Sequence, residues 1–154
     1  MNILSKSNKL PEQIFLGLEK DSKASYRATT NGTEITVLPE FVSRQNSAIG
    51  DLFIWAYHVR IEHQNSENIQ LLNRHWKIID EDGVKREVEG EGVIGQQPKI
   101  TPNNSFQYSS GVHLARPSGI MKGHYEMQRE NGEKFQVEIP TFSLDSPALQ
   151  KSIN

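Results

Sequence analysis

Apolar and polar side chains alternate along most of this chain, a pattern typical of β-strands. The clearest example is FIWAYHVRIEH, residues 53–63. Its apolar positions fall on one face: Phe53, Trp55, Tyr57, Val59 and Ile61. The residues between them, which include His58 and Arg60, fall on the other face. The pattern predicts a half-buried strand, with the apolar face in the core and the polar face toward solvent.

Two shorter segments show the same alternation. TEITVLPEF places Ile35 and Val37 on one face, and we expect this strand to end at Pro39, because proline has no N–H to donate to a neighbouring strand. FQYSSG follows the turn-forming residues TPNNS and carries Phe106 and Tyr108 at alternate positions. Each segment therefore predicts one short strand.

Two pairs of segments are separated by turn residues that are typical of β-hairpins. IQLLNRHWKII and VKREVE flank an acidic turn that contains Asp82 and Gly83. HYEMQRENGEKFQVEIP holds two alternating arms around Asn131 and Gly132. Asp-Gly and Asn-Gly favour the tight turns that join antiparallel strands. The sequence thus predicts two hairpins.

The strands number about seven, and no convincing helical pattern lies between any two of them. A parallel sheet would need crossover helices, so the pattern predicts an all-β fold, an antiparallel sandwich of two sheets, over residues 26–146. Residues 1–25 read as an N-terminal extension, where Leu10, Ile14 and Leu18 recur every four positions and leave a short helix or partial disorder open. Residues 147–154 form a C-terminal tail.

The composition narrows the functional classes. Seventeen basic residues against nineteen acidic ones give a net charge of −2, so no basic surface of the kind that binds nucleic acid is expected. The chain contains no cysteine, which excludes disulfides and thiolate chemistry. No apolar run is long enough for a membrane span, and the first residues lack the apolar core of a signal peptide. We therefore expect a soluble, cytoplasmic protein without membrane insertion.

The stretch VEGEGVIGQQP contains Gly90, Gly92 and Gly95 at the G-x-G-x-x-G spacing of dinucleotide-binding turns. Such a turn must open a helix, yet Pro98 and Pro102 follow where that helix would run. The acidic ribose partner is missing as well. A dinucleotide-binding fold is therefore excluded.

Two interpretations of these glycines stay open. They could connect strands, supplying positive φ angles or room for another backbone. Alternatively, the N–H groups of the loop could bind an anion, helped by Lys85, Arg86 or Lys99.

Arg74, His75 and Trp76 form the most chemically suggestive cluster. Neighbours in a strand point to opposite faces, so the three cannot line one pocket unless a bulge re-aims one of them. We expect Trp76 in the core with Leu72 and Ile78, and His75 as a hydrogen-bonded structural residue or a functional one. Arg74 could hold a carboxylate of a nearby loop, such as that of Glu89 or Glu91, or an external anion.

Metal binding and catalysis have weak support in the sequence. The five histidines show no H-x-x-x-H or H-E-x-x-H spacing, and the acidic run at 80–82 reads as a solvated turn. Ser109, Ser110 and His113 suggest a nucleophile and a base, but no third residue can be named to orient the histidine. We expect no metal site, no cofactor and no enzymatic activity.

Several motifs together resemble the ApaG family. They are LLNRHWKIID, EVEGEGVIGQQPKITPNNSFQYSSG, RPSGIMKGHYEM and FQVEIPTFSL, in this order, and the resemblance covers about residues 26–144. Asn73 stands where the family usually has Ser, and Asn103 stands where it has a turn Gly. Asparagine tolerates the left-handed backbone, so we expect Asn103 to preserve that turn.

The resemblance implies a fibronectin-III-like or immunoglobulin-like sandwich. It also implies a link to cobalt tolerance and magnesium efflux in bacteria, and to protein binding in related eukaryotic domains, with no agreed catalytic residues. We expect a non-enzymatic binding or regulatory module that recognises a protein partner and influences divalent-cation homeostasis indirectly. Its docking surface would combine residues 90–97 with residues 116–119, which include Arg116. A homodimer stays open.

Two other functions compete with this hypothesis. The first is binding of a pyrophosphate-containing nucleotide, or of its metal complex, at the glycine loop. It requires Arg74, Lys85, Arg86 or Lys99 to converge on the loop's N–H groups. The second is a phosphohydrolase, which would also need carboxylates placed to hold a divalent ion.

Overall fold

The structure is a computed structural model that describes residues 25–147. In this range the chain forms nine strands. They are β1 (Tyr26–Thr30), β2 (Thr33–Ser47), β3 (Gly50–His63), β4 (Ile69–Asp80), β5 (Lys85–Glu91), β6 (Lys99–Ile100), β7 (Asn104–Leu114), β8 (Ser118–Arg129) and β9 (Lys134–Asp145). The proposed N-terminal helix around Leu10, Ile14 and Leu18 lies outside the described residues.

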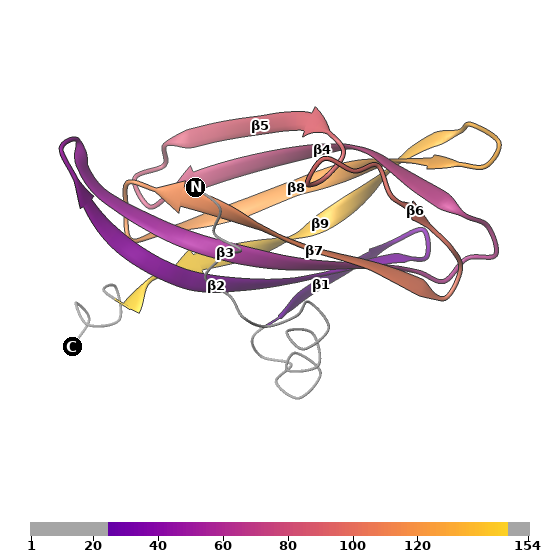
Figure 1. Ribbon diagram of the computed structural model, residues 1–154, viewed down its shortest axis with the longest axis horizontal. Coiled ribbons are helices and arrows are strands. Elements are labelled where there is room, and N and C mark those ends of the chain that lie inside the picture. The colour runs from indigo at the N-terminus through magenta and orange to yellow at the C-terminus, as the bar shows by residue number, and fades with distance from the viewer. Residues whose placement is uncertain (1–24, 148–154) are drawn as a thin grey trace.

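The strands form two antiparallel sheets that pack face to face (Figure 1). Sheet A has the order β1-β2-β3-β7, and sheet B has the order β5-β4-β8-β9, with the short β6 also paired to β4. The predicted antiparallel sandwich is confirmed. The strand number exceeds the expected seven because a turn at Asn31 and Gly32, both with positive φ, separates β1 from β2, and because β6 was not anticipated.

The core fills the space between the sheets with aromatic and branched side chains. The ring of Trp76 lies 5.2 Å from that of Tyr57 and 6.0 Å from that of Phe142, centroid to centroid, in edge-on geometries. Such contacts are the arrangement that aromatic quadrupoles favour. The five apolar positions predicted on β3 are all buried: Phe53, Trp55, Tyr57, Val59 and Ile61.

Strand β3 differs from the prediction on its other face. Ala56, His58 and Arg60 are buried as well, so the strand is covered on both faces rather than half-buried. The alternation could not show this, because β3 is an inner strand whose polar side chains contact neighbouring strands. His58, for example, bonds side chains of β2 and β7.

Two further expectations need correction. Strand β2 does not end at Pro39 but continues to Ser47, with Pro39 opposite Tyr57 of β3. Because β1 begins at Tyr26, opposite Val37, Pro39 is paired with β3 alone among the described residues, and a missing N–H is tolerated on the other side. In β4, Leu71 rather than Leu72 joins Trp76 in the core, because a register shift intervenes between Leu71 and Asn73.

The predicted turns are confirmed. Gly83 and Gly132, in the turns of the two hairpins, have φ angles of 83° and 87°. Asn103 has a φ of 60°, and its N–H donates to the carbonyl of His63 over 2.7 Å, so asparagine preserves the turn as expected. Within residues 25–147, no helix has the length and apolar character needed to cross a membrane.

Candidate functional site

The glycine loop after β5 closes on itself. The N–H of Gly92 donates to Leu72 over 2.8 Å, and Val93 and Gln96 exchange N–H to carbonyl bonds of 2.8 and 2.9 Å. Between these two residues, Ile94 and Gly95 have φ angles of 44° and 76°. The loop is a strand connection that needs positive φ, as the first interpretation proposed, and the N–H groups of Gly92, Val93 and Gln96 are used internally.

Arg74 supports this loop from β4. Its Nη1 donates to the carbonyls of Glu91 and Gly92, at 3.1 and 2.9 Å, so it binds backbone rather than the carboxylates suggested by the sequence. A Cβ atom at Gly90, opposite Arg74, would lie 2.8 Å from the guanidinium nitrogens. Gly90 therefore leaves the space that the guanidinium occupies, which is a packing role.

The other predicted basic residues do not converge on the loop. Lys85 and Arg86 begin β5, whereas the loop follows its end, and Arg86 donates to the carbonyl of His113 over 2.8 Å. Lys99 lies on β6 opposite Gln70. The convergence that nucleotide binding requires is thus not found among the described residues.

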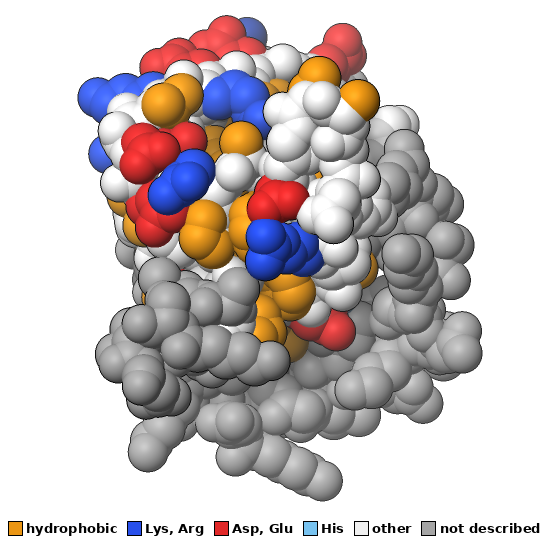
Figure 2. Space-filling view, turned by 90° about the vertical axis from the view of Figure 1, so that its left-hand side faces the viewer, with side chains coloured by type: hydrophobic (Ala, Val, Ile, Leu, Met, Phe, Trp, Pro, Cys, Tyr) orange, Lys and Arg blue, Asp and Glu red, His pale blue; other side chains and the backbone are white. Residues whose placement is uncertain are grey.

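Arg116 lies at the opposite end of β5 from the glycine loop. It forms ion pairs of 3.1 Å with both Glu81 and Asp82 in the β4–β5 turn. Figure 2 looks at this end of the sandwich and shows acidic and basic side chains interspersed. Residues 90–97 and 116–119 therefore do not form one continuous docking surface, because β5 separates them.

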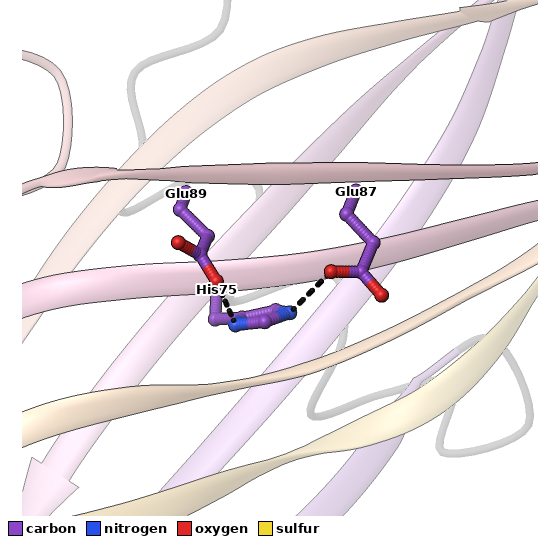
Figure 3. Close-up of side chains that lie close together, drawn as sticks. All are labelled: His75, Glu87 and Glu89. Carbon is purple, nitrogen blue, oxygen red and sulfur yellow. Dashed lines mark ion pairs between the residues drawn. The ribbon is translucent and has the colours of Figure 1, made fainter.

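A cluster that the sequence did not indicate lies on the outer face of sheet B. His75 sits between two carboxylates of β5 (Figure 3). Its Nδ1 is 2.9 Å from Glu89 and its Nε2 is 3.5 Å from Glu87. The three side chains offer ligand atoms within 4.8 Å of one another, the only such group of His, Asp and Glu side chains in the part of the chain that is described.

His124 of β8 extends this cluster across the sheet. It is the register partner of His75, and the two rings are 5.0 Å apart, centroid to centroid. Both rings border a surface hollow of about 400 Å³, which Glu89, Glu91 and Glu126 also line. No local spacing could have found this pair, because only the β4–β8 register brings the two histidines together.

A second histidine network is buried on sheet A. His58 lies 2.6 Å from Ser109 through Nδ1 and 2.9 Å from Glu40 through Nε2. The composition matches a serine hydrolase triad, but the two ring nitrogens are used in the opposite sense. Ser109 also lies within β7 and is 8% exposed, so the group is a satisfied polar network rather than an accessible nucleophile. The suggested pairing of Ser109 or Ser110 with His113 is not formed: Ser109 bonds His58, and Ser110 bonds Tyr57.

Tyrosine hydroxyls form the polar part of the core. The hydroxyls of Tyr108 and Tyr125 are hydrogen-bonded to each other, and burial raises the pKa of both. Burial also raises the pKa of Tyr57, although its hydrogen bond with Ser110 acts in the other direction. These groups stay neutral over the physiological range.

Strand β5 is an edge of sheet B, and its side chains are almost all exposed. Five large hydrophobic side chains are exposed among the described residues, and three of them lie on this strand or beside it: Val84, Val88 and Ile94. Free strand edges and exposed apolar side chains are both common in docking surfaces.

The ApaG domain family matches residues 43–129. Protein ApaG of Methylocella silvestris is 49% identical over 129 residues, which cover 84% of this chain and 99% of that protein. Protein ApaG of Agrobacterium fabrum is 47% identical over the same shares. The crystal structure of the ApaA protein from Bordetella pertussis is 39% identical, with a TM-score of 0.70 over 75% of this chain and 94% of that chain. The sequence resemblance, the sandwich and these matches agree: the chain belongs to the ApaG family.

Proposed function

We propose that this chain is a non-enzymatic binding module that docks an extended segment of a protein partner along the free edge of β5. The observation that carries the proposal is a coincidence within residues 25–147: the strand edge that no described strand pairs with carries or adjoins three of the five exposed large hydrophobic side chains of this range. Adding a strand to such an edge is a recurrent mode of peptide recognition.

The backbone of β5 presents alternate hydrogen-bonding groups to this edge. At the two ends of the hairpin, Val84 accepts a bond from Asp80 and Gly92 donates one to Leu72. The register between these points has no shift, so the even-numbered residues face β4. Lys85, Glu87 and Glu89 therefore direct their N–H and C=O groups toward the open side, where a partner strand would pair.

The side chains of β5 define the chemistry of the partner. Glu87, Glu89 and Glu91 lie on one face after Lys85, and Val84 and Val88 lie on the other, with Arg86 between them held by the carbonyl of His113. A complementary segment alternates basic residues with apolar ones, because cross-strand pairs of opposite charge and of apolar side chains stabilise a sheet. Any influence on divalent-cation homeostasis, the context associated with the family, would be exerted through such a partner.

A heptapeptide that alternates Lys and Val tests the proposal, with a control peptide in which Glu replaces Lys. Backbone NMR of the full chain should show the amides of Lys85, Glu87 and Glu89 shifting with the basic peptide alone. Glu87→Pro removes an outward N–H, whereas Glu87→Ala removes only the carboxylate. We expect E87P to abolish binding and E87A to weaken it modestly.

Two results would contradict the proposal. One is a set of shifted amides that lies away from β5. The other is protection of the outward β5 amides in the free protein at high concentration, which would identify a second copy of the chain as the paired segment.

A further inference from the structure

A row of ionisable side chains crosses the outer face of sheet B. The strand registers place Glu89 opposite His75, His75 opposite His124, and His124 opposite Glu138. Glu87 lies beside the row on β5. The two neighbouring imidazoles have no role in the core or in strand pairing at the β5 edge. The inference drawn from them therefore does not rest on the proposed function.

We propose that this row is a binding site for a divalent transition-metal ion of the Zn²⁺ type. Two ligands are already in place, His75 through Nε2 and a carboxylate oxygen of Glu87, and the third is His124 after a rotation of its side chain toward them. Glu89 is a positioning residue that acts through His75.

The two nitrogens of His75 differ in a way that suits this assignment. Nδ1 is 2.9 Å from Glu89, whereas Nε2 is shielded from solvent and has no hydrogen-bond partner. An unsatisfied buried nitrogen is uncommon in native proteins, and an unseen ion is one of its explanations. A carboxylate bonded to one nitrogen of a metal-binding histidine fixes its tautomer and raises its basicity. Glu89 thus holds a proton on Nδ1 and leaves the Nε2 lone pair for the ion.

The spacing of the two imidazoles fits a shared ion. Two imidazoles bound to one tetrahedral Zn²⁺, each through a nitrogen about 2 Å from the metal, have ring centroids about 5 Å apart. The centroids of His75 and His124 are 5.0 Å apart and the ring planes are inclined by 31°, so the rings have the required separation and His124 has to turn one nitrogen toward the ion. Glu87, already 3.5 Å from Nε2, supplies the oxygen ligand.

The surrounding charges favour a cation. Three more carboxylates border the two histidines on this face, those of Glu91, Glu126 and Glu138. The opposing charges are the ammonium groups of Lys77 and Lys122, on the neighbouring row, and the guanidinium of Arg74, which donates to carbonyls of the glycine loop. Imidazole combined with carboxylate suits Zn²⁺ and similar ions, whereas Mg²⁺ prefers oxygen ligands alone. The site should therefore bind Zn²⁺ more tightly than Mg²⁺.

Calorimetric titration of the full chain with Zn²⁺, and separately with Mg²⁺, tests the proposal. We expect one Zn²⁺ per chain and no measurable heat from Mg²⁺. His75→Gln and His124→Gln should each remove measurable Zn²⁺ binding, and Glu89→Gln should weaken it by about tenfold. The matched control is His113→Gln, because His113 is exposed on β7 outside the row and its loss should leave the affinity unchanged.

Thermal unfolding of each variant establishes that the fold is retained, which we expect because the row lies on an outer face. The proposal is overturned if the wild-type chain binds no Zn²⁺, if His75→Gln binds as tightly as the wild type, or if His113→Gln weakens binding as much as His75→Gln does. Equal affinity for Mg²⁺ would also overturn it, since the imidazoles would then have no role.

Discussion

His58 and His75 occupy equivalent places in the two sheets, yet their surroundings differ. Each lies within a long inner strand, β3 or β4, and each has a glutamate within 2.9 Å. The side chain of His58 is 2% exposed and both of its nitrogens are bonded, to Ser109 and to Glu40. The side chain of His75 is 21% exposed, and its Nε2 has no hydrogen-bond partner, with the carboxylate of Glu87 3.5 Å away.

The difference in exposure and hydrogen bonding indicates a structural role for His58 and a binding role for His75, although each histidine lies beside a glutamate. A buried polar network is favourable only when all its members are satisfied, and once satisfied it has no capacity left for a ligand. A partly exposed group with one nitrogen outside any hydrogen bond keeps that capacity. We therefore assign the His58 network to stability and the His75 row to binding.

Replacing each of the two histidines in turn should give the largest difference in the free energy of unfolding. We expect His58→Ala to lower the free energy of unfolding by about 3 kcal/mol, because it opens a cavity and leaves Ser109 without its partner. His75→Ala should change it by less than about 0.5 kcal/mol, as is usual for partly exposed side chains, because His75 is 21% exposed. Urea denaturation of both variants measures the difference, and equal losses would contradict the assignment.

High pH should reveal a second buried network, the Tyr108–Tyr125 pair. Burial raises the pKa of both hydroxyls in the folded state, so the folded chain retains protons that the unfolded chain releases above about pH 10. This stability is complete below pH 10 and is lost as the pH rises further, at up to about 1.4 kcal/mol per pH unit for each group. Tyr125→Phe should make the loss shallower in urea denaturation between pH 9 and 11, and an unchanged slope would count against the pair.

A smaller effect is expected at the hydroxyl that completes the His58 network. Ser109→Ala leaves Nδ1 of His58 buried without a partner, which should cost about 1–2 kcal/mol of unfolding free energy. The matched variant is Ser105→Ala, on an exposed position of the same strand. If the two variants unfold at the same denaturant concentration, the network contributes nothing to stability.

The smallest effect is expected at the ion pairs of the His75 row. Glu87→Gln should change the free energy of unfolding by less than about 0.5 kcal/mol, since exposed ion pairs contribute little. The same denaturation measurement checks it. A loss above 1 kcal/mol would mean that the row is structural after all and resembles the His58 network.

The fold could be predicted from the sequence because its signals are local. Alternation identified the core face of β3, and turn residues located the hairpins at Gly83 and Gly132. Features that depend on neighbouring strands could not be predicted. The bulge that puts Leu71 in place of Leu72 and the continuation of β2 past Pro39 both follow from pairing partners that a single segment does not reveal.

The candidate site was less accessible to prediction for the same reason. Pro98 and Pro102 were enough to exclude the helix that a dinucleotide-binding turn needs, but the choice between a strand connection and an anion-binding loop stayed open until the hydrogen bonds of the loop were seen. Spacing rules for metal ligands apply within one helix or loop, whereas His75 and His124 meet only through the β4–β8 register. Likewise, the partner of Ser109 proved to be His58, on an adjacent strand, and not His113 nearby in the sequence.

The most direct test is an NMR spectrum of the imidazole side chains, recorded before and after one equivalent of Zn²⁺. All five histidines lie in the described part of the chain, so each reports on its own environment. The signals of His75 and His124 should shift together, while those of His58, His63 and His113 stay in place. A shift at His58, or none at His75, would contradict the division between a buried structural network and an accessible binding row.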